Sequence, residues 1–355
     1  MADKKKARIG LGSFDLVKGM AILAVIIGHA LQGHPGGDAL FSGTLGSLIG
    51  SLLWGLMPMF FIISGYGFKS KPVIKMLKKT FAELMVPYLI AIPLATALHF
   101  VFFWKRYPNM GYRIIDAEKR IVAFLLGTDS AGPLWFFLAL FIASNILNLV
   151  LNVRKEWLQV LLVILCIMSS FLIMNFEFRY FRLIEGLSAV GFVYIGYLLK
   201  QKKYHDNVFA SVWAYILLFV MWLLQFIGMI KGGSGFDMAR ADYTFLSYVY
   251  AGGTGLLIVF CGLLLNRVNW FGKEFITKCG MYSYWILIIH TIDYLAVPWW
   301  DLWSENPYPI LASVIELGLR ILIITLGCEI IKKVTKLRYK KNRNFDSKIT
   351  HKVSC

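Results

Sequence analysis

The stretch FDLVKGMAILAVIIGHALQG, residues 14–33, is as long and as apolar as a membrane crossing, yet it contains a lysine and a histidine. A spanning helix needs about 20 predominantly apolar residues. A charged side chain at the centre of a bilayer costs roughly 2.5–3.5 kcal/mol on insertion scales. Lys18 and His29 therefore need an explanation, which is either a polar environment between helices or a chemical role.

The rest of the chain has the same apolar character. Of its 355 residues, 58% are hydrophobic and 16% are charged, whereas a soluble domain has about 25% charged residues. We therefore predict an all-α integral membrane protein with about ten transmembrane helices. The predicted crossings are 14–34, 43–66, 84–104, 132–152, 157–175, 183–200, 208–230, 246–266, 279–299 and 308–331.

The basic residues between these crossings predict the orientation. If the N-terminus is cytoplasmic, most Lys and Arg lie in the loops that would face the cytoplasm, which is the positive-inside pattern. We therefore predict that both termini are cytoplasmic. A basic segment, 1–13, precedes the transmembrane domain 14–331, and a basic tail, 332–355, follows it. The net charge of +17 then reflects topology and anionic lipid headgroups, and we expect membrane lipids but no nucleic acid as partners.

Lys18 and His29 lie on one face of the first predicted helix. They are 11 residues apart, so at 100° per residue their directions differ by about 20°, and the rise between them is about 16 Å. A cation at the cytoplasmic mouth and a titratable imidazole deeper on the same face could line one polar channel for an elongated anion. The alternatives are that Lys18 reaches the interface beside Asp15 and that His29 bonds a neighbouring helix.

A second basic group follows the second crossing. In KSKPVIKMLKKT, residues 69–80, the side chains of Lys75, Lys78 and Lys79 have helical spacing and form one cationic face. Such a face suits phosphate groups, although the positive-inside pattern alone also accounts for it. Trp135, in GPLWFFLALF, residues 132–141, fits either an interfacial aromatic belt or a ring that contacts substrate.

The remaining candidates are polar residues near predicted helix ends or within crossings. His290 and Asp293, in YSYWILIIHTIDY, are one turn apart and either fix a tautomer for catalysis or tie the helix into the bundle. Glu185 either contacts a sugar or is an ordinary loop residue. We expect His34, His99, His205 and His351 to be solvated or interfacial, and the sequence has no HExxH or other zinc spacing.

Five segments together resemble a known enzyme family. DLVKGMAILAVIIGH, MPMFFIISGYGFK, the lysine-rich loop with VPY, PLWFFLALF and YSYWILIIH occur in the expected order over nearly the whole chain. They resemble the membrane-bound acyltransferase family 3, and within it the fucose 4-O-acetylase-like sugar acetyltransferases. The resemblance implies about ten transmembrane helices and location in a bacterial plasma membrane.

The resemblance also implies an activity and a set of residues. It implies transfer of an acetyl or other short acyl group from cytoplasmic acyl-CoA to a glycan hydroxyl, with acetyl-CoA as co-substrate and no permanently bound cofactor. His29 matches the essential histidine, Lys18 matches the basic residue of the R/K-x10-H motif, and Lys75 and Lys78 match a basic pair expected near the CoA phosphates. Lys stands for Arg at these positions, so bidentate phosphate contacts are lost.

On this basis we expect an acetyl-CoA-dependent O-acetyltransferase. Lys75, Lys78, Lys79 and Lys18 would hold the cofactor, and His29 would act as general base or acyl acceptor. The acceptor would be a glycan or lipid-linked sugar, and a homodimer is compatible with the sequence. The alternative is a transporter or flippase of a sugar or small acid, which would favour broken helices or inverted repeats.

Overall fold

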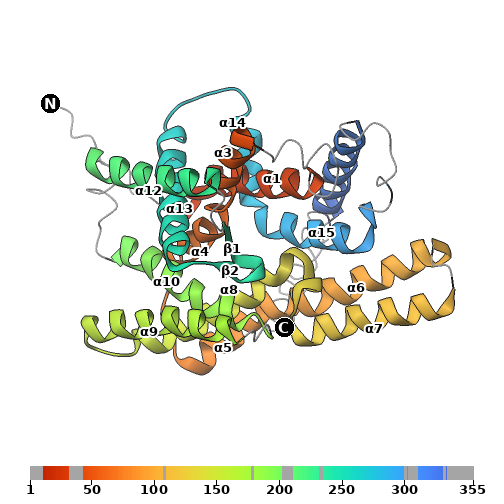
Figure 1. Cartoon of the computed structure of the whole chain (residues 1–355), viewed down its shortest axis with the longest axis horizontal. Helices are drawn as coiled ribbons and strands as arrows, with labels where there is room; N and C mark the ends of the chain where they lie inside the picture. The colour runs from red at the N-terminus through yellow and green to blue at the C-terminus, as the bar shows by residue number, and fades with distance from the viewer. Residues whose placement is uncertain are drawn as a thin grey trace, which may run out of the picture.

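The computed structural model of the chain is almost entirely helical (Figure 1). It describes residues 11–31, 43–106, 109–176, 180–201, 211–231, 235–299, 302, 311–330 and 333. The predictions for His34, His205 and His351, for the first ten residues and for nearly all of the basic tail therefore lie outside the described residues.

The structure contains the following elements in chain order. The helices of the first half are α1 (Asp15–Leu31), α3 (Gly43–Leu53), α4 (Leu56–Tyr66), α5 (Val73–Thr80), α6 (Val86–Phe103), α7 (Met110–Leu126), α8 (Trp135–Leu151) and α9 (Glu156–Asn175). The second half contains α10 (Leu183–Gln201), α12 (Val212–Ile230), the short antiparallel strands β1 (Phe236–Asp237) and β2 (Asp242–Tyr243), α13 (Phe245–Leu265), α14 (Lys273–Met281), α15 (Ser283–Ala296) and the helix Leu311–Ile330.

Within the described residues, nine helices are long and apolar enough to cross a membrane. This confirms the predicted all-α integral membrane fold. The expected crossing 279–299 differs, because the chain there forms α14 and the 14-residue α15, with a break at Tyr282. Fourteen residues rise only about 21 Å, which is less than the roughly 30 Å of the hydrocarbon core. Val297, which precedes Pro298, is extended and ends α15.

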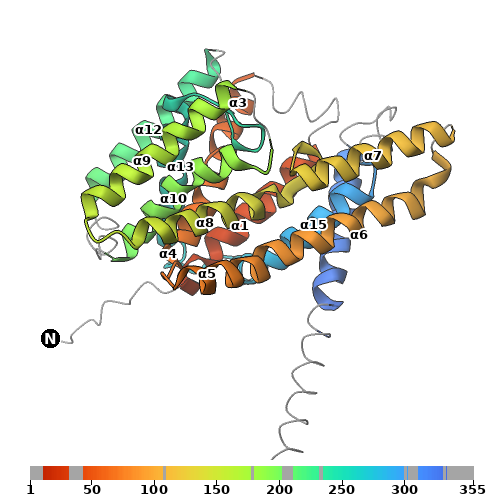
Figure 2. The same ribbon diagram turned by 90° about the horizontal axis from the view of Figure 1, so that it is seen from below.

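Two further segments differ from the sequence prediction. The basic residues of α5 do not lie in a loop, because Val73–Phe103 is one continuous helix that includes a π-helical turn at Phe81–Met85. The hydrophilic segment 105–131 is mostly the helix α7, which begins at the cap residue Asn109 and ends at Gly127 in a left-handed conformation (φ 61°). Helices α6 and α7 lie side by side in both views (Figure 2).

Two helix pairs approach so closely that only glycine fits between them. A Cβ on Gly65 of α4 would lie 1.9 Å from the Val193 carbonyl oxygen of α10. A Cβ on Gly19 of α1 would lie 1.9 Å from the Ile276 carbonyl oxygen, and one on Gly280 of α14 would lie 1.6 Å from the Asp15 carbonyl oxygen. The break between α14 and α15 is next to this contact. Backbone-to-backbone packing against α14 therefore fixes where α1 presents its side chains.

Candidate active site

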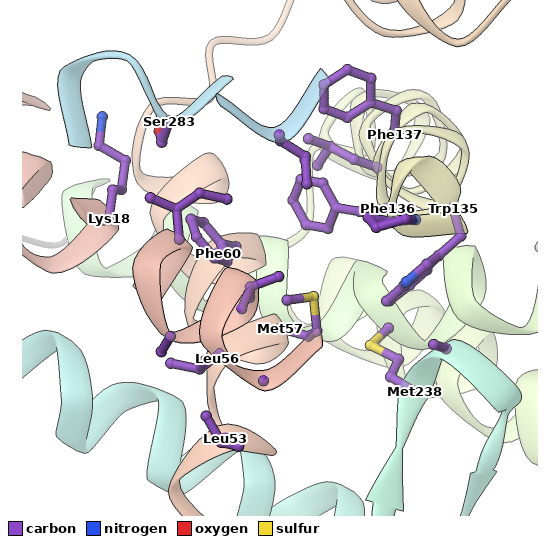
Figure 3. Close-up of a pocket in the computed structure, with 18 of the residues that line it drawn as sticks. Lys18, Leu53, Leu56, Met57, Phe60, Trp135, Phe136, Phe137, Met238 and Ser283 are labelled. Atoms are coloured by element: carbon purple, nitrogen blue, oxygen red, sulfur yellow. The ribbon is translucent and has the colours of Figure 1, made fainter. Parts of the chain in front are cut away.

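A cavity of about 720 Å³ lies between α1, α3, α4 and α8, the segment that follows β1 and the start of α15. Figure 3 shows Lys18 and Ser283 on one side of it and Trp135 and Met238 on the other. Both Lys18 and His29 line its wall. The stripe that the helical spacing predicts on α1 therefore faces one common cavity.

Most of the cavity wall is apolar. Its larger apolar side chains are Ile22, Val25, Leu53, Trp54, Leu56, Met57, Phe60, Ile63, Leu84, Trp135, Phe136, Phe137, Leu140, Phe236, Met238 and Leu287. Lys18 and Asp237 are the charged residues of the wall, and His29 adds an imidazole. A ligand here therefore meets few polar groups, and these fix its orientation.

Lys18 both pairs with Asp15 and lies in the cavity wall, two arrangements that the sequence left as alternatives. Its Nζ lies 2.6 Å from Oδ1 of Asp15, one turn earlier on α1. Its side chain nevertheless retains 25% of its exposure and lines the cavity. The ammonium group is therefore held by a neighbouring carboxylate while it remains accessible from the cavity.

His29 contacts a second histidine from a distant part of the chain. Its Nδ1 lies 2.9 Å from Nε2 of His290 on α15, and the two rings are nearly parallel with centroids 5.1 Å apart. Tyr294 packs against His29 from the same helix, with ring centroids 4.9 Å apart. His29 is half-buried, whereas His290 is completely buried. His29 is therefore the imidazole that reaches the cavity, and His290 lies behind it.

Three charged residues continue this arrangement away from the cavity. His290 Nδ1 lies 3.9 Å from Asp293 Oδ2. Arg320, on the helix Leu311–Ile330, donates from Nη1 to the same Asp293 oxygen at 2.9 Å and from Nε to Glu316 at 2.7 Å. Trp299 donates from Nε1 to the other Asp293 oxygen at 3.2 Å. Asp293 is among the candidates from the sequence, whereas Arg320 and Glu316 are not, although an Arg–Glu pair one turn apart inside an apolar run supports a hypothesis of function.

The three lysines proposed for the cofactor lie outside the cavity. Lys75, Lys78 and Lys79 are all exposed on α5, and Lys79 pairs with Glu83 at 3.4 Å. None of them lines the cavity wall, although Leu84, one turn beyond Thr80, does. The cationic face on α5 therefore exists as the spacing predicts, but it is separate from the wall that contains Lys18 and His29.

Glu185 is buried in the first turn of α10. Its side chain is 5% exposed, and its Oε1 accepts a hydrogen bond of 2.7 Å from Nη1 of Arg182. The same Arg182 atom donates to the carbonyl oxygen of Ala239, which lies in the cavity wall. Glu185 therefore is not an ordinary loop residue, because it lies in α10 and Arg182 pairs with it inside the protein, and its contact with a sugar stays a prediction.

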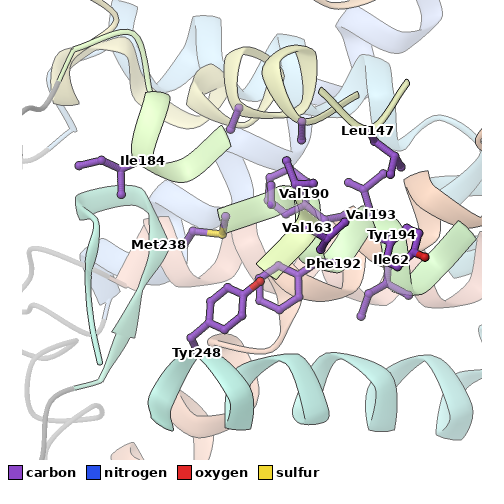
Figure 4. Close-up of a cluster of buried hydrophobic side chains, with 14 of the residues drawn as sticks. Ile62, Leu147, Val163, Ile184, Val190, Phe192, Val193, Tyr194, Met238 and Tyr248 are labelled. Carbon is purple, nitrogen blue, oxygen red and sulfur yellow. The ribbon is translucent and has the colours of Figure 1, made fainter. Parts of the chain in front are cut away.

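The segment between α12 and α13 closes one side of the cavity. The hairpin Phe236–Tyr243 contributes Phe236 and Met238 to the wall. Figure 4 shows Met238 directed toward α10 and Tyr248 stacked against Phe192, with ring centroids 4.5 Å apart. The Tyr243 hydroxyl also hydrogen-bonds the hydroxyl of Ser188. No pattern in the sequence indicates this hairpin, because its contacts come from α10 and α13.

His99 is not the solvated or interfacial histidine that we expected. It is 4% exposed, and its Nδ1 lies 2.9 Å from the carbonyl oxygen of Ala296 at the end of α15. Arg120 of α7 donates to the neighbouring Leu295 carbonyl oxygen at 3.1 Å and lies 3.4 Å from His99 Nε2. The expectation was wrong because α7 covers the helix end that appeared exposed in the sequence.

The site so described is a pair of imidazoles, one half-buried and one buried, at a cavity within a multi-helix membrane protein. Among the described residues, no group of three or more His, Cys, Asp or Glu is arranged to hold a metal ion. These features define a membrane protein with a candidate acid–base or nucleophilic centre on its first helix.

Comparison with known families agrees with this class. A family model described as an acyltransferase domain matches residues 11–331, which is most of the chain. The protein belongs to the acyltransferase 3 family and is an acyltransferase. No curated protein and no solved structure matches it. The family match favours acyl transfer over the transporter that the sequence left as an alternative.

Proposed function

We propose that the protein transfers an acetyl or other short acyl group from acyl-CoA to a hydroxyl of a glycan, and that His29 carries the reaction. The observation that supports this most directly is the shared wall of one cavity, which contains the imidazole of His29 and the ammonium group of Lys18. An acyl-CoA donor needs a cationic contact for its anionic portion and a base or nucleophile at its thioester. Lys18 and His29 supply one of each.

In the first form of the reaction, His29 is a general base. Its Nε2 takes the proton of the acceptor hydroxyl, the hydroxyl oxygen bonds to the acyl carbon, and the carbon–sulfur bond breaks. The CoA thiolate then accepts this proton from His29. In the second form, Nε2 itself attacks the acyl carbon and CoA leaves as the thiolate. The acceptor hydroxyl oxygen then bonds to the acyl carbon, the bond from that carbon to Nε2 breaks, and the hydroxyl proton passes to the CoA thiolate. Both forms use Nε2, because Nδ1 is occupied by His290.

The exposed lysines of α5 have a separate role in this proposal. Lys75, Lys78 and Lys79 attract the CoA phosphates at the surface, and the continuous helix leads from them to Leu84 in the cavity wall. The pantetheine arm then enters the cavity and passes Lys18. The cations therefore act in sequence, with the α5 lysines at the surface and Lys18 inside.

The acceptor is proposed to be a glycan or a lipid-linked sugar. The resemblance to fucose 4-O-acetylase-like enzymes supports a sugar hydroxyl, and Trp135 in the cavity wall offers an aromatic face for a sugar ring. The resemblance also supports location in a bacterial plasma membrane, and the positive-inside pattern supports cytoplasmic termini. Membrane lipids surround the apolar helices, and a homodimer remains an assembly to be tested.

The test is acyl transfer by purified protein in nanodiscs with radiolabelled acetyl-CoA and an extracted glycan fraction. His29→Ala should lower turnover by about 10²–10⁴-fold, which is the usual contribution of a general base. Lys278→Gln, on an exposed ion pair of α14, serves as the control and should keep wild-type turnover. Turnover of His29→Ala within tenfold of wild type, with a normal thermal unfolding profile, contradicts the proposal. In sealed proteoliposomes, movement of the sugar across the bilayer without label incorporation would favour a transporter.

A further inference from the structure

The hydrogen bond between the two imidazoles has a direction that the surrounding groups determine. His29 Nδ1 and His290 Nε2 are 2.9 Å apart, so one of these nitrogens carries the proton and the other offers a lone pair. If His29 donates, its Nε2 is unprotonated and free to act in the cavity. If His290 donates, His29 must carry its proton on Nε2 and cannot act as a base there.

The other nitrogen of His290 decides between these directions. Its Nδ1 is buried, has no hydrogen-bond partner among the described residues and faces Asp293 Oδ2 at 3.9 Å. If His290 donated from Nε2 as a neutral ring, Nδ1 would turn a lone pair toward this carboxylate oxygen, and two acceptors would face each other without water. With the proton on Nδ1, a positive edge faces the carboxylate. The favourable direction therefore runs from His29 to His290 and from His290 toward Asp293.

From this geometry we propose that His290 and Asp293 fix the tautomer of His29, with its proton on Nδ1 and its lone pair on Nε2, and that Arg320 is a positioning residue for Asp293. This inference rests on the proposed function of His29. The distance of 3.9 Å is too long for a hydrogen bond, so in this structure the contact between His290 and Asp293 is electrostatic. Such contacts in unliganded enzymes often shorten when the substrate complex forms.

The carboxylate of Asp293 is held from two sides. Arg320 donates to its Oδ2 at 2.9 Å and Trp299 donates to its Oδ1 at 3.2 Å. Arg320 is in turn fixed by Glu316, whose Oε1 lies 2.7 Å from Nε and 2.6 Å from Nη2. These contacts leave Oδ2 directed toward His290 without freedom to turn away. Arg320 is therefore placed to act on the reaction through the position of Asp293.

The charges of the cluster favour the reacting state when both of its carboxylates are ionised. If ionised, Asp293 and Glu316 carry two negative charges, and Arg320 carries one positive charge, so the three together carry one negative charge. His29 becomes positive when it takes the hydroxyl proton or the acyl group. A buried negative charge behind it stabilises that state more strongly than the same charge in water would. No proton needs to pass from His29 to His290 or from His290 to Asp293, because each histidine retains its Nδ1 proton.

Two substitutions of similar size at His290 test the proposal. Glutamine can place an amide oxygen where His290 Nε2 accepts, whereas leucine cannot accept a hydrogen bond. His290→Leu should lower kcat by about 10²-fold or more, and His290→Gln should remain within about tenfold of wild type. KM for acetyl-CoA should change by less than about threefold in both. Equal losses of kcat in the two variants, with equal thermal stability, would overturn the proposal.

A direct measurement separates this inference from the proposed function. Nitrogen-15 NMR of histidine-labelled protein in nanodiscs distinguishes protonated from unprotonated imidazole nitrogens, and comparison with His29→Asn assigns the His29 signals. We expect a protonated Nδ1 and an unprotonated Nε2 in wild type and in His290→Gln, and a mixture of tautomers in His290→Leu. A proton on Nε2 of wild-type His29 would refute the tautomer assignment. If the assignment holds but His29→Ala still transfers acyl groups, the proposed function fails instead.

Discussion

Two buried arginine–carboxylate clusters lie beside the same cavity. In the first cluster Arg320 pairs with Glu316 and Asp293, and each of these residues is at most 3% exposed. In the second cluster Arg182 pairs with Glu185, and these residues are 3% and 5% exposed. Both clusters require charged groups to be moved out of water, which costs several kcal/mol per ion before the attraction between the ions is counted.

The clusters differ in the group that each one contacts at the cavity. The first faces His290 through Asp293 and so reaches the imidazole of His29. The second donates to the carbonyl oxygen of Ala239 and so holds the hairpin in the wall. A buried ion pair is therefore not by itself evidence of catalysis. Its role follows from whether its last contact is a group that can change protonation or a backbone atom that cannot.

The largest expected effects come from removal of the two arginines. Arg320→Met removes the guanidinium that Asp293 and Glu316 share, and Arg182→Met removes that of Glu185. Each change should lower the free energy of unfolding by about 3–5 kcal/mol, because breaking a buried pair leaves an uncompensated charge. Denaturant unfolding in detergent followed by tryptophan fluorescence measures this. A loss below 1 kcal/mol at either position would show that its carboxylate is neutral in the folded protein.

Removal of the remaining charges should then separate the clusters. The double variant Arg182→Met/Glu185→Leu and the triple variant Arg320→Met/Glu316→Leu/Asp293→Leu replace ions with apolar side chains, which is often neutral or stabilising. We expect both to recover stability to within about 1–2 kcal/mol of wild type. Acyl transfer should be close to that of wild type only in the double variant, because the triple variant has no carboxylate behind His290. Recovered turnover in the triple variant would show that the first cluster is structural as well.

The parts of this comparison that could be predicted from the sequence are the local ones. Lys18 and His29 share a helix face because their spacing is close to a whole number of turns, and His290 and Asp293 are one turn apart. The contact between His29 and His290 joins residues 261 positions apart, and periodicity carries no information on such a contact. Arg320 is visible in the sequence only as a charge within the predicted crossing 308–331, because its partner Asp293 lies on another helix.

The differences in the fold have the same cause. Hydropathy predicts one crossing over 279–299, but the chain breaks at Tyr282, next to the close approach of Gly280 and Asp15. His99 was expected at an exposed helix end, and it is buried because Arg120 from α7 covers that end. In each case a second segment of the chain decides the environment. Local pattern identifies which side chains are unusual, and packing decides what each of them touches.

A half-exposed ion pair extends the comparison to smaller effects on stability. Lys18 and Asp15 are 2.6 Å apart, as are Lys278 and Glu274 on the exposed face of α14. Lys18→Gln should raise KM for acetyl-CoA about tenfold, because Lys18 reaches the cavity, with little change in stability since accessible pairs contribute about 0–1 kcal/mol. Lys278→Gln should change neither quantity.

For the Lys18 and Lys278 variants, initial rates over a range of acetyl-CoA concentrations measure KM, and thermal unfolding measures stability. The exposed lysines of α5 provide a graded intermediate case. Lys78→Gln should raise KM by about threefold at low salt and by less at high salt, because screening weakens a surface contact more than a buried one. If Lys18→Gln leaves KM unchanged while Lys78→Gln raises it, the cofactor does not enter along α1.

The smallest expected effects concern the aromatic rings beside each cluster. Tyr294 packs on His29 with ring centroids 4.9 Å apart, and Tyr248 stacks on Phe192 near the second cluster at 4.5 Å. Aromatic contacts contribute about 0.5–1.5 kcal/mol beyond their buried area. Tyr294→Leu should therefore lower turnover by about two- to tenfold, whereas Tyr294→Phe keeps the ring and should remain within about twofold.

The same substitution at Tyr248 should act on stability instead of turnover. Its hydroxyl donates to the Ser188 carbonyl oxygen at 2.8 Å, so Tyr248→Phe should lower the free energy of unfolding by about 1 kcal/mol while acyl transfer persists. Steady-state kinetics and unfolding of the three variants measure the two quantities side by side. A ring that positions His29 affects the reaction without affecting the fold, and a ring that packs beside the hairpin does the reverse. If Tyr248→Phe instead lowers turnover at unchanged stability, the hairpin side of the cavity also takes part in the reaction, and the division between the two clusters does not hold.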